Sequence, residues 1–147
     1  MSNAIKKTIE LNAPISRVWR ALTDHEEFGA WFRVRLDNPF KVGEVSTGQV
    51  TYPGYEHLVW RALVHRMDQE SLFTFSWNPY DSNDNIELDK ETTLVEFHLQ
   101  ATANGTVLTV TESGFDALTD PRRLEAFREN SKGWEEQMKN ITAYVNA

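Results

Sequence analysis

Glu112 is the residue with the clearest potential for chemistry in this chain. It follows Leu108 and Val110 at two-residue steps in a segment rich in Val and Thr, and alternate residues of a strand share one face of a sheet. Its carboxyl group would therefore point inward beside two apolar neighbours. Burial raises the pKa of a carboxyl group, which would let Glu112 act as a general acid, a general base or a ligand anchor. In the alternative interpretation the strand ends or bulges there, and Glu112 is solvated or pairs with Arg or Lys.

Aromatic side chains are the second group that could form a site. They make up 12% of the chain and include five tryptophans, so rings can fill a core and also line an apolar pocket. The side chains that we expect around a ligand are Trp31, Tyr52, Trp60, Trp77, Phe97, Glu112, Phe115, Trp134 and Met138. For each ring taken singly, plain core packing is the alternative.

Metal and cofactor chemistry have little support in the sequence. There is no cysteine, and the four histidines lack the spacing of a zinc site. Residues 81–85 resemble the start of a calcium loop, but Ile86 stands where that loop needs Gly and Thr92 where it needs Glu. No serine has the context of a nucleophile, and no glycine-rich loop could cradle a phosphate. We therefore expect no metal, no cofactor, and no catalytic residue unless Glu112 is one.

Composition limits the partners and the compartment. The formal net charge of −7 argues against nucleic-acid binding, which needs a basic face for the phosphates. No apolar run is long enough for membrane insertion, and Met1–Lys7 lacks the apolar core of a signal peptide. The absence of cysteine suits a reducing cytoplasm, where we expect the protein. The length of 147 residues indicates one domain over residues 1–147.

The first third of the chain predicts one strand and two short helices. Apolar and polar residues alternate over Ile5–Leu11, as in a half-buried strand. Pro14 then opens a helix, because a proline costs nothing at the first helical position. That helix should end near Asp24, and a second is expected over Glu26–Phe32, with Gly29 as a weak point.

The middle of the chain predicts a run of antiparallel strands. Val, Thr, Phe and Tyr dominate five segments that are separated by turn residues such as Asn104-Gly105. The expected strands are Val45–Tyr52, Leu58–Met67, Leu72–Trp77, Thr92–Ala101 and Thr106–Glu112.

The last stretch predicts one long amphipathic helix. Its apolar residues recur at steps of three and four, and they include Trp134 and Met138. The helix should open at Pro121 with Asp120 as its cap, and the strands ahead of it supply the sheet that it needs to cover. Gly133, in mid-helix, either lets the helix approach the sheet closely or lets it bend around a cavity; close approach is the preferred interpretation.

Four separate motifs carry a family likeness. The segment Ala13–Asp24 followed by Trp31-Phe32 resembles the opening of the SRPBCC superfamily, which contains START and birch-pollen-allergen-like proteins. Within it, the chain looks most like the branch of the activator of heat-shock protein 90 ATPase, C-terminal-domain-like. The remaining motifs, in the order of that branch, are Leu72–Trp77, Thr109–Phe115 and Gly133-Trp134. The resemblance implies an α+β helix-grip fold: a curved antiparallel sheet wrapped around a long C-terminal helix, with two short helices after the first strand.

The same resemblance frames the expected function. Members of the superfamily bind apolar or amphipathic small molecules in a cavity between sheet and helix, and this is the leading hypothesis. One alternative is a co-chaperone that contacts a heat-shock ATPase, with a chaperone as partner and a role in stress response. Another is a polyketide cyclase- or hydrolase-like enzyme using Glu112, although a non-enzymatic role is favoured. The protein is expected to be a monomer or a homodimer.

Overall fold

The computed structural model describes residues 4–80 and 91–146. The segment 81–85, compared above with a calcium loop, lies outside the described residues. The elements follow one another as β1 (Ala4–Leu11), α1 (Ile15–Thr23), α2 (His25–Phe32), β2 (Val34–Leu36), β3 (Val45–Val50), β4 (Val59–Asp68), β5 (Leu72–Trp77), β6 (Thr93–Thr102), β7 (Gly105–Ser113), a short 3-10 helix (Phe115–Ala117) and α3 (Arg123–Val145).

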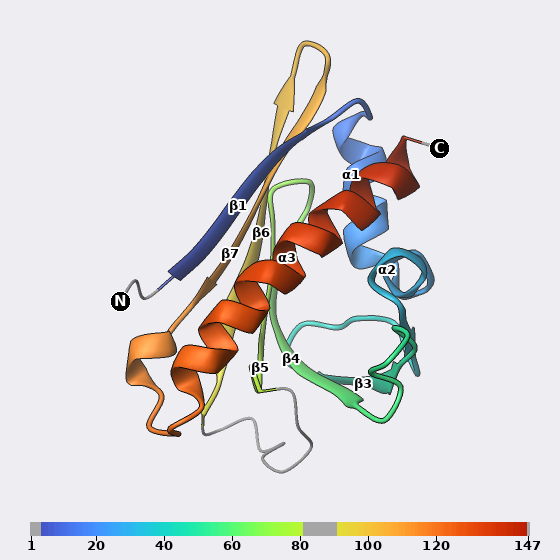
Figure 1. Ribbon diagram of the computed structural model, residues 1–147. Helices are drawn as coiled ribbons and strands as arrows, with labels where there is room; N and C mark the ends of the chain where they lie inside the picture. The colour runs from blue at the N-terminus through green and yellow to red at the C-terminus, as the bar shows by residue number, and fades with distance from the viewer. Residues whose placement is uncertain (1–3, 81–90, 147) are drawn as a thin grey trace.

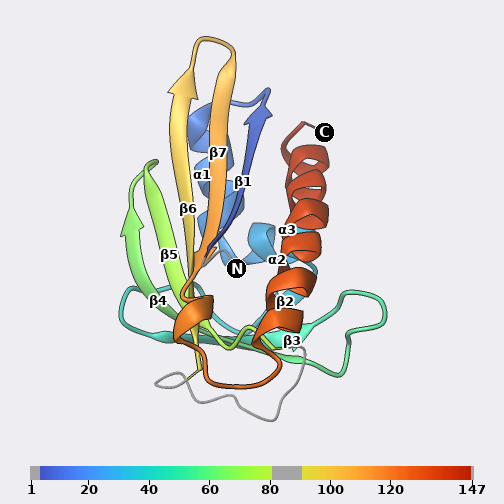
Figure 2. The same cartoon turned by 60° about the vertical axis from the view of Figure 1, so that its left-hand side comes forward.

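The strands form one antiparallel sheet of seven, in the order β1-β7-β6-β5-β4-β3-β2. Strands β2 to β7 follow the chain as a meander, and β1 joins the far edge beside β7. Figures 1 and 2 show α3 lying across the hollow face of this curved sheet, with α1 and α2 beside its C-terminal half. This is the predicted α+β helix-grip architecture.

Strand alternation determines which side chains face the helices. In β7 the buried residues are Thr106, Leu108, Val110 and Glu112, at every second position. The register places Glu112 between Ile5 of β1 and Val95 of β6, and both of these neighbours are buried. Glu112 is therefore an acidic residue within an apolar row of the sheet.

Two local features bend the sheet and tie the short helices to it. The register of β4 against β5 shifts between Val64 and Arg66, and such a bulge increases twist and curvature. Gly29 is required in α2 because a Cβ there would lie 2.3 Å from the carbonyl oxygen of Val34. Gly29 weakens α2, but its lack of a side chain lets β2 begin close to the helix.

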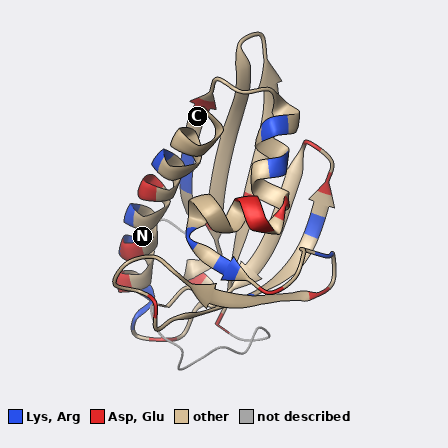
Figure 3. Ribbon diagram, turned by 90° about the vertical axis from the view of Figure 1, so that its right-hand side faces the viewer, with Lys and Arg blue, Asp and Glu red and all other residues tan. Residues whose placement is uncertain are grey.

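The ends of some elements differ from the sequence prediction. Helix α3 begins at Arg123, and Asp120 does not cap it, because its carboxylate accepts hydrogen bonds from the backbone and guanidinium nitrogens of Arg122 instead. Strand β2 was not predicted, since three residues are too few to show a period. None of the helices within the described residues is long and apolar enough to cross a membrane. Acidic and basic residues are interspersed along α3 (Figure 3).

Candidate functional site

Glu112 accepts hydrogen bonds from four neutral side chains and has no exposed surface. Its Oε2 accepts from the indole Nε1 of Trp77 at 2.9 Å and from the hydroxyl of Thr93 at 2.5 Å. Its Oε1 accepts from the indole Nε1 of Trp134 at 2.8 Å. The amide nitrogen of Asn130 donates to both oxygens, at 3.2 and 3.1 Å. We call these four donors the Glu112 cage.

Two opposing influences set the pKa of Glu112. Burial raises the pKa of this carboxyl group above 4.5, and the four donors of the cage act in the opposite direction. An indole N–H can only donate, so Trp77 and Trp134 are suited to a carboxylate rather than to a carboxylic acid. The arrangement favours the anion by geometry while burial penalises it.

The two indoles of the cage also belong to an aromatic cluster that we call the aromatic floor. The rings of Trp77 and Trp134 stack with their centroids 5.7 Å apart. The ring centroids of Trp60 and Trp77 are 5.5 Å apart, and the ring centroid of Phe32 lies 5.4 to 6.2 Å from those of all three tryptophans. The four rings come from α2, β4, β5 and α3, so the floor joins elements that are far apart in sequence.

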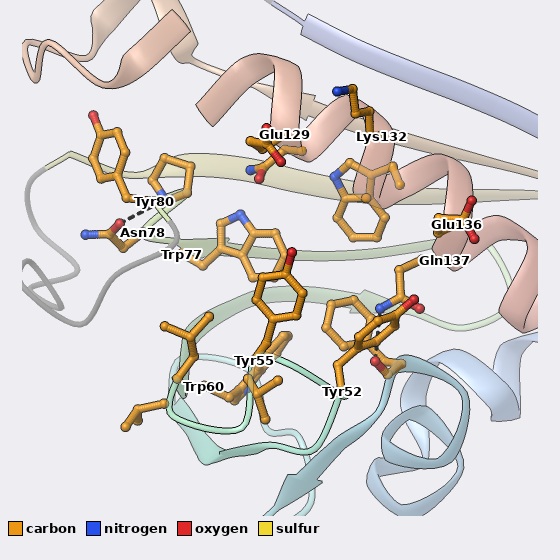
Figure 4. A pocket seen from close by; sticks show the side chains of 18 of the residues that line it. Tyr52, Tyr55, Trp60, Trp77, Asn78, Tyr80, Glu129, Lys132, Glu136 and Gln137 are labelled. Atoms are coloured by element: carbon orange, nitrogen blue, oxygen red, sulfur yellow. Dashed lines mark hydrogen bonds between the residues drawn. The ribbon is translucent and has the colours of Figure 1, made fainter. Parts of the chain in front are cut away.

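A pocket of about 410 Å³ lies over the aromatic floor. Its opposite wall is the β3–β4 loop, from which Tyr52 and Tyr55 project toward α3 (Figure 4). The α3 side contributes Asn130, Gly133 and Gln137. The indole N–H groups of Trp77 and Trp134 are bonded to Glu112, and that of Trp60 donates to the hydroxyl of Ser46 at 3.0 Å. The floor therefore offers a ligand mainly ring surface.

Gly133 corrects the preferred sequence interpretation. A Cβ built at this position meets no atom within 4 Å, so glycine is not needed for close approach of α3 to the sheet. Gly133 lines the pocket instead. It leaves open the part of the mouth that a larger side chain on α3 could cover.

The structure brings together only some of the residues singled out from the sequence. Tyr52, Trp60, Trp77 and Trp134 line the pocket, and Glu112 lies directly behind the two indoles. The other four lie elsewhere: Trp31 donates to the carbonyl of Ala21, Phe97 packs under Trp134, Phe115 packs against Phe127, and Met138 borders a shallow groove between α3 and β1.

Sequence reasoning did not single out Phe32, Tyr55, Tyr80, Asn130 or Gln137, all of which line the pocket. A signal existed for Asn130, because it precedes Trp134 by four residues and so shares its helix face. Tyr55 ends the turn that begins at Tyr52, and its backbone N–H donates to the Tyr52 carbonyl at 2.9 Å. Across residues 4–80 and 91–146, no three His, Asp or Glu side chains gather closely enough to hold a metal ion.

The curved sheet, the gripped helix and the pocket between them define an SRPBCC-type helix-grip domain. A family model described as activator of Hsp90 ATPase homolog 1-like protein matches residues 12–146, and the chain belongs to this family. The match covers every element after β1. No curated protein matches the chain.

Solved structures from several sources share the fold. MLL2253 from Mesorhizobium loti is 21% identical with a TM-score of 0.77, over 97% of this chain and 96% of that one. BH1534 from Bacillus halodurans is 22% identical with a TM-score of 0.71, again over 97% and 96%. DynU16, a protein of the dynemicin biosynthetic locus, is 18% identical with a TM-score of 0.77, over 100% of this chain and 48% of that one. At these identities the likeness concerns the fold.

Proposed function

We propose that the protein binds an apolar, ring-containing small molecule in the pocket over the aromatic floor. The observation that carries this proposal is an open space of about 410 Å³, within the size range of small-molecule sites, at a point where α3 presents glycine. A helix pays about 1 kcal/mol for an interior glycine relative to alanine. Keeping the pocket mouth open is a reason for that cost, since close packing does not require it.

Binding energy would come mainly from burial of apolar surface. Each Å² of apolar area removed from water contributes about 25 cal/mol, and offset or edge-to-face ring contacts add to it. The floor rings hold one another at fixed angles, so a ligand loses little free energy in ordering them. A small molecule is also in keeping with the biosynthetic locus of DynU16.

We assign Glu112 a positioning role in this site. It has no exposed surface and does not line the pocket, whereas three of its four donors do. Its carboxylate fixes the N–H edges of Trp77 and Trp134 and thereby the orientation of their faces. This role differs from the general acid–base role of the enzyme alternative. That alternative, the chaperone partner, the oligomeric state and the cytoplasmic location stay predictions.

The variant Gly133→Leu tests the site. A leucine favours the helix more than glycine does and meets open space, so stability should hold or rise while the pocket mouth closes. Lipids, flavonoids and polyketides are screened by thermal shift and by NMR line broadening. Ligands that stabilise the wild type should lose at least about tenfold in affinity, equal to about 1.4 kcal/mol.

The matched control is Glu135→Leu, which adds the same side chain to an exposed position of α3 outside this pocket. It should leave ligand affinity unchanged. Equal affinity of a ligand for the wild type and for Gly133→Leu would contradict the proposed site.

A further inference from the structure

The charges around the pocket leave one negative charge without a counterpart. Four charged residues line the pocket, and the two cations Arg61 and Lys132 balance the two anions Glu129 and Glu136. Glu112 adds a carboxylate directly behind the floor, and its partners there are neutral donors. Among the charged residues of the lining together with Glu112, the anions therefore outnumber the cations by one when Glu112 is ionised.

The two cations of the lining do not occupy the floor. Arg61 is exposed and stands next to Trp60 in β4, so its side chain points to the opposite face of the sheet. The amine of Lys132 points away from the rings of the pocket in Figure 4. Trp77 is partly exposed, whereas Trp134 is 3% exposed and stacks on it. The ring surface left to a ligand is therefore mainly that of Trp77, backed by Trp134.

The orientation of the indoles makes these ring surfaces more negative. The face of an aromatic ring carries partial negative charge and its edge carries positive charge. Trp77 and Trp134 direct their positive N–H edges at the Glu112 carboxylate, away from the pocket. Hydrogen bonds to an anion polarise the donor, and the low dielectric of the interior strengthens this effect. Both indoles therefore present electron-rich faces.

Rings at the margin of the same pocket already carry cations. The guanidinium of Arg33 lies 5.3 Å from the ring centre of Tyr52, and that of Arg122 lies 4.7 Å from the ring centre of Tyr80. Both distances are within the range of cation–π contacts. The outer rings are thus engaged by side chains of the protein, whereas the contacts of Trp77 and Trp134 described above are with other rings and with the Glu112 cage.

We propose that the ligand of this pocket is an apolar organic cation, such as a quaternary ammonium or a protonated aryl or alkyl amine, with its charge against the ring face of Trp77, backed by Trp134. The inference rests on the proposed function, because it names the ligand class of the same site. An organic cation loses less hydration than a metal ion would, and aromatic surfaces bind it through both apolar burial and charge.

A matched pair of probes tests the charge. 4-Hydroxyphenyltrimethylammonium and 4-tert-butylphenol have the same size and shape and differ by one positive charge. Titration calorimetry on the whole protein should show the cation binding about tenfold more tightly or better, the advantage expected of desolvated cation–π contact. In Glu112→Gln the ratio between the probes should fall toward one, while Glu135→Gln, outside the pocket, should leave it unchanged.

A second variant covers the case in which Glu112→Gln does not fold. Trp77→Phe keeps a ring in the pocket and removes one N–H link to the carboxylate, so the ratio should fall by several-fold. Equal or tighter binding of the neutral probe, lost in Gly133→Leu, would overturn the cation inference and leave the proposed function standing. Failure of both probes to bind up to their solubility limits would count against both proposals.

Discussion

Two carboxyl groups of the protein, those of Glu27 and Glu112, are held in opposite ways. Glu27 of α2 forms ion pairs with Arg17 at 2.5 Å and Arg20 at 2.7 Å, both on α1. It also accepts from the hydroxyl of Tyr144 on α3, at 3.2 Å. This Glu27 cluster stays partly exposed, with 20% of the glutamate side chain accessible. Glu112 is fully buried and is held by neutral donors.

The difference separates a structural contact from a functional one. The Glu27 cluster joins three helices with charges that water can reach, which is an ordinary way to fix helix packing. The Glu112 cage holds a carboxyl group in the interior, where burial penalises its charged form. What the cage provides is a fixed orientation of two indoles at the pocket. The free-energy cost of burying this carboxyl group is therefore found next to the proposed ligand site.

Removal of the buried acceptor should have the largest effect on stability. In Glu112→Leu the indole N–H groups of Trp77 and Trp134 lose their partner, and each buried donor without a partner costs about 1–3 kcal/mol. We expect a loss of about 3 kcal/mol or more in the free energy of unfolding, measured with urea. Thr93→Val, which removes one donor and leaves the acceptor, should cost about 1 kcal/mol. A loss below 1 kcal/mol in Glu112→Leu would show that the donors of the cage find other partners, and would contradict this prediction.

Removal of the charge at Glu27 should have a smaller effect that depends on salt. Glu27→Gln keeps the shape, and Arg17 and Arg20 retain contact with water, so we expect a loss of about 1 kcal/mol. The difference from the wild type should shrink in 1 M salt, because ions screen exposed pairs. Glu26→Gln, on the exposed side of the same helix, is the control and should change little. A loss that stays constant with salt would indicate packing rather than charge.

The pH dependence of the buried carboxylate should be the smallest effect, since the donors of the cage offset part of the burial. Burial raises the pKa of Glu112 above its ordinary value of 4.5, so the folded state holds the proton more tightly than the unfolded state. Its contribution to stability is complete below about pH 4.5 and is lost as the pH rises through the folded pKa. The stability of the wild type minus that of Glu112→Gln should therefore decrease from pH 4.5 to neutral pH. An increase in this difference over the same pH range would show that folding lowers the pKa of Glu112 rather than raising it.

Sequence periodicity was sufficient for most helices and strands, and the family resemblance supplied their helix-grip arrangement. Alternation in β4 to β7 and the three-and-four spacing of α3 depend on local geometry, so the elements and their buried faces could be predicted within a few residues. The same alternation put Glu112 on the inner face, beside Leu108 and Val110. Strand β2 was not predicted from the sequence, because its formation depends on pairing with β3 rather than on any pattern of its own.

The site was less predictable because it depends on convergence and on empty space. Trp77, Asn130 and Trp134 reach Glu112 from 35, 18 and 22 residues away, and no local pattern encodes that meeting. Trp31 and Phe115 are aromatic residues like Trp60, so residue type alone favoured a place in the pocket for all three. Trp31 and Phe115 nevertheless pack elsewhere. Gly133 shows the limit most clearly: a sequence records that a side chain is missing, whereas the volume left beside it is a property of the fold.

The stacked pair of Trp77 and Trp134 has a consequence for optical measurement. Indoles whose centres lie 5.7 Å apart exchange excitation energy readily, and Trp60 is close enough to join them. Three of the five fluorophores of this type thus emit as a coupled group at the wall of the pocket. The molecule contains its own reporter, and occupation of the pocket should alter the intensity and colour of its ultraviolet emission without any attached dye.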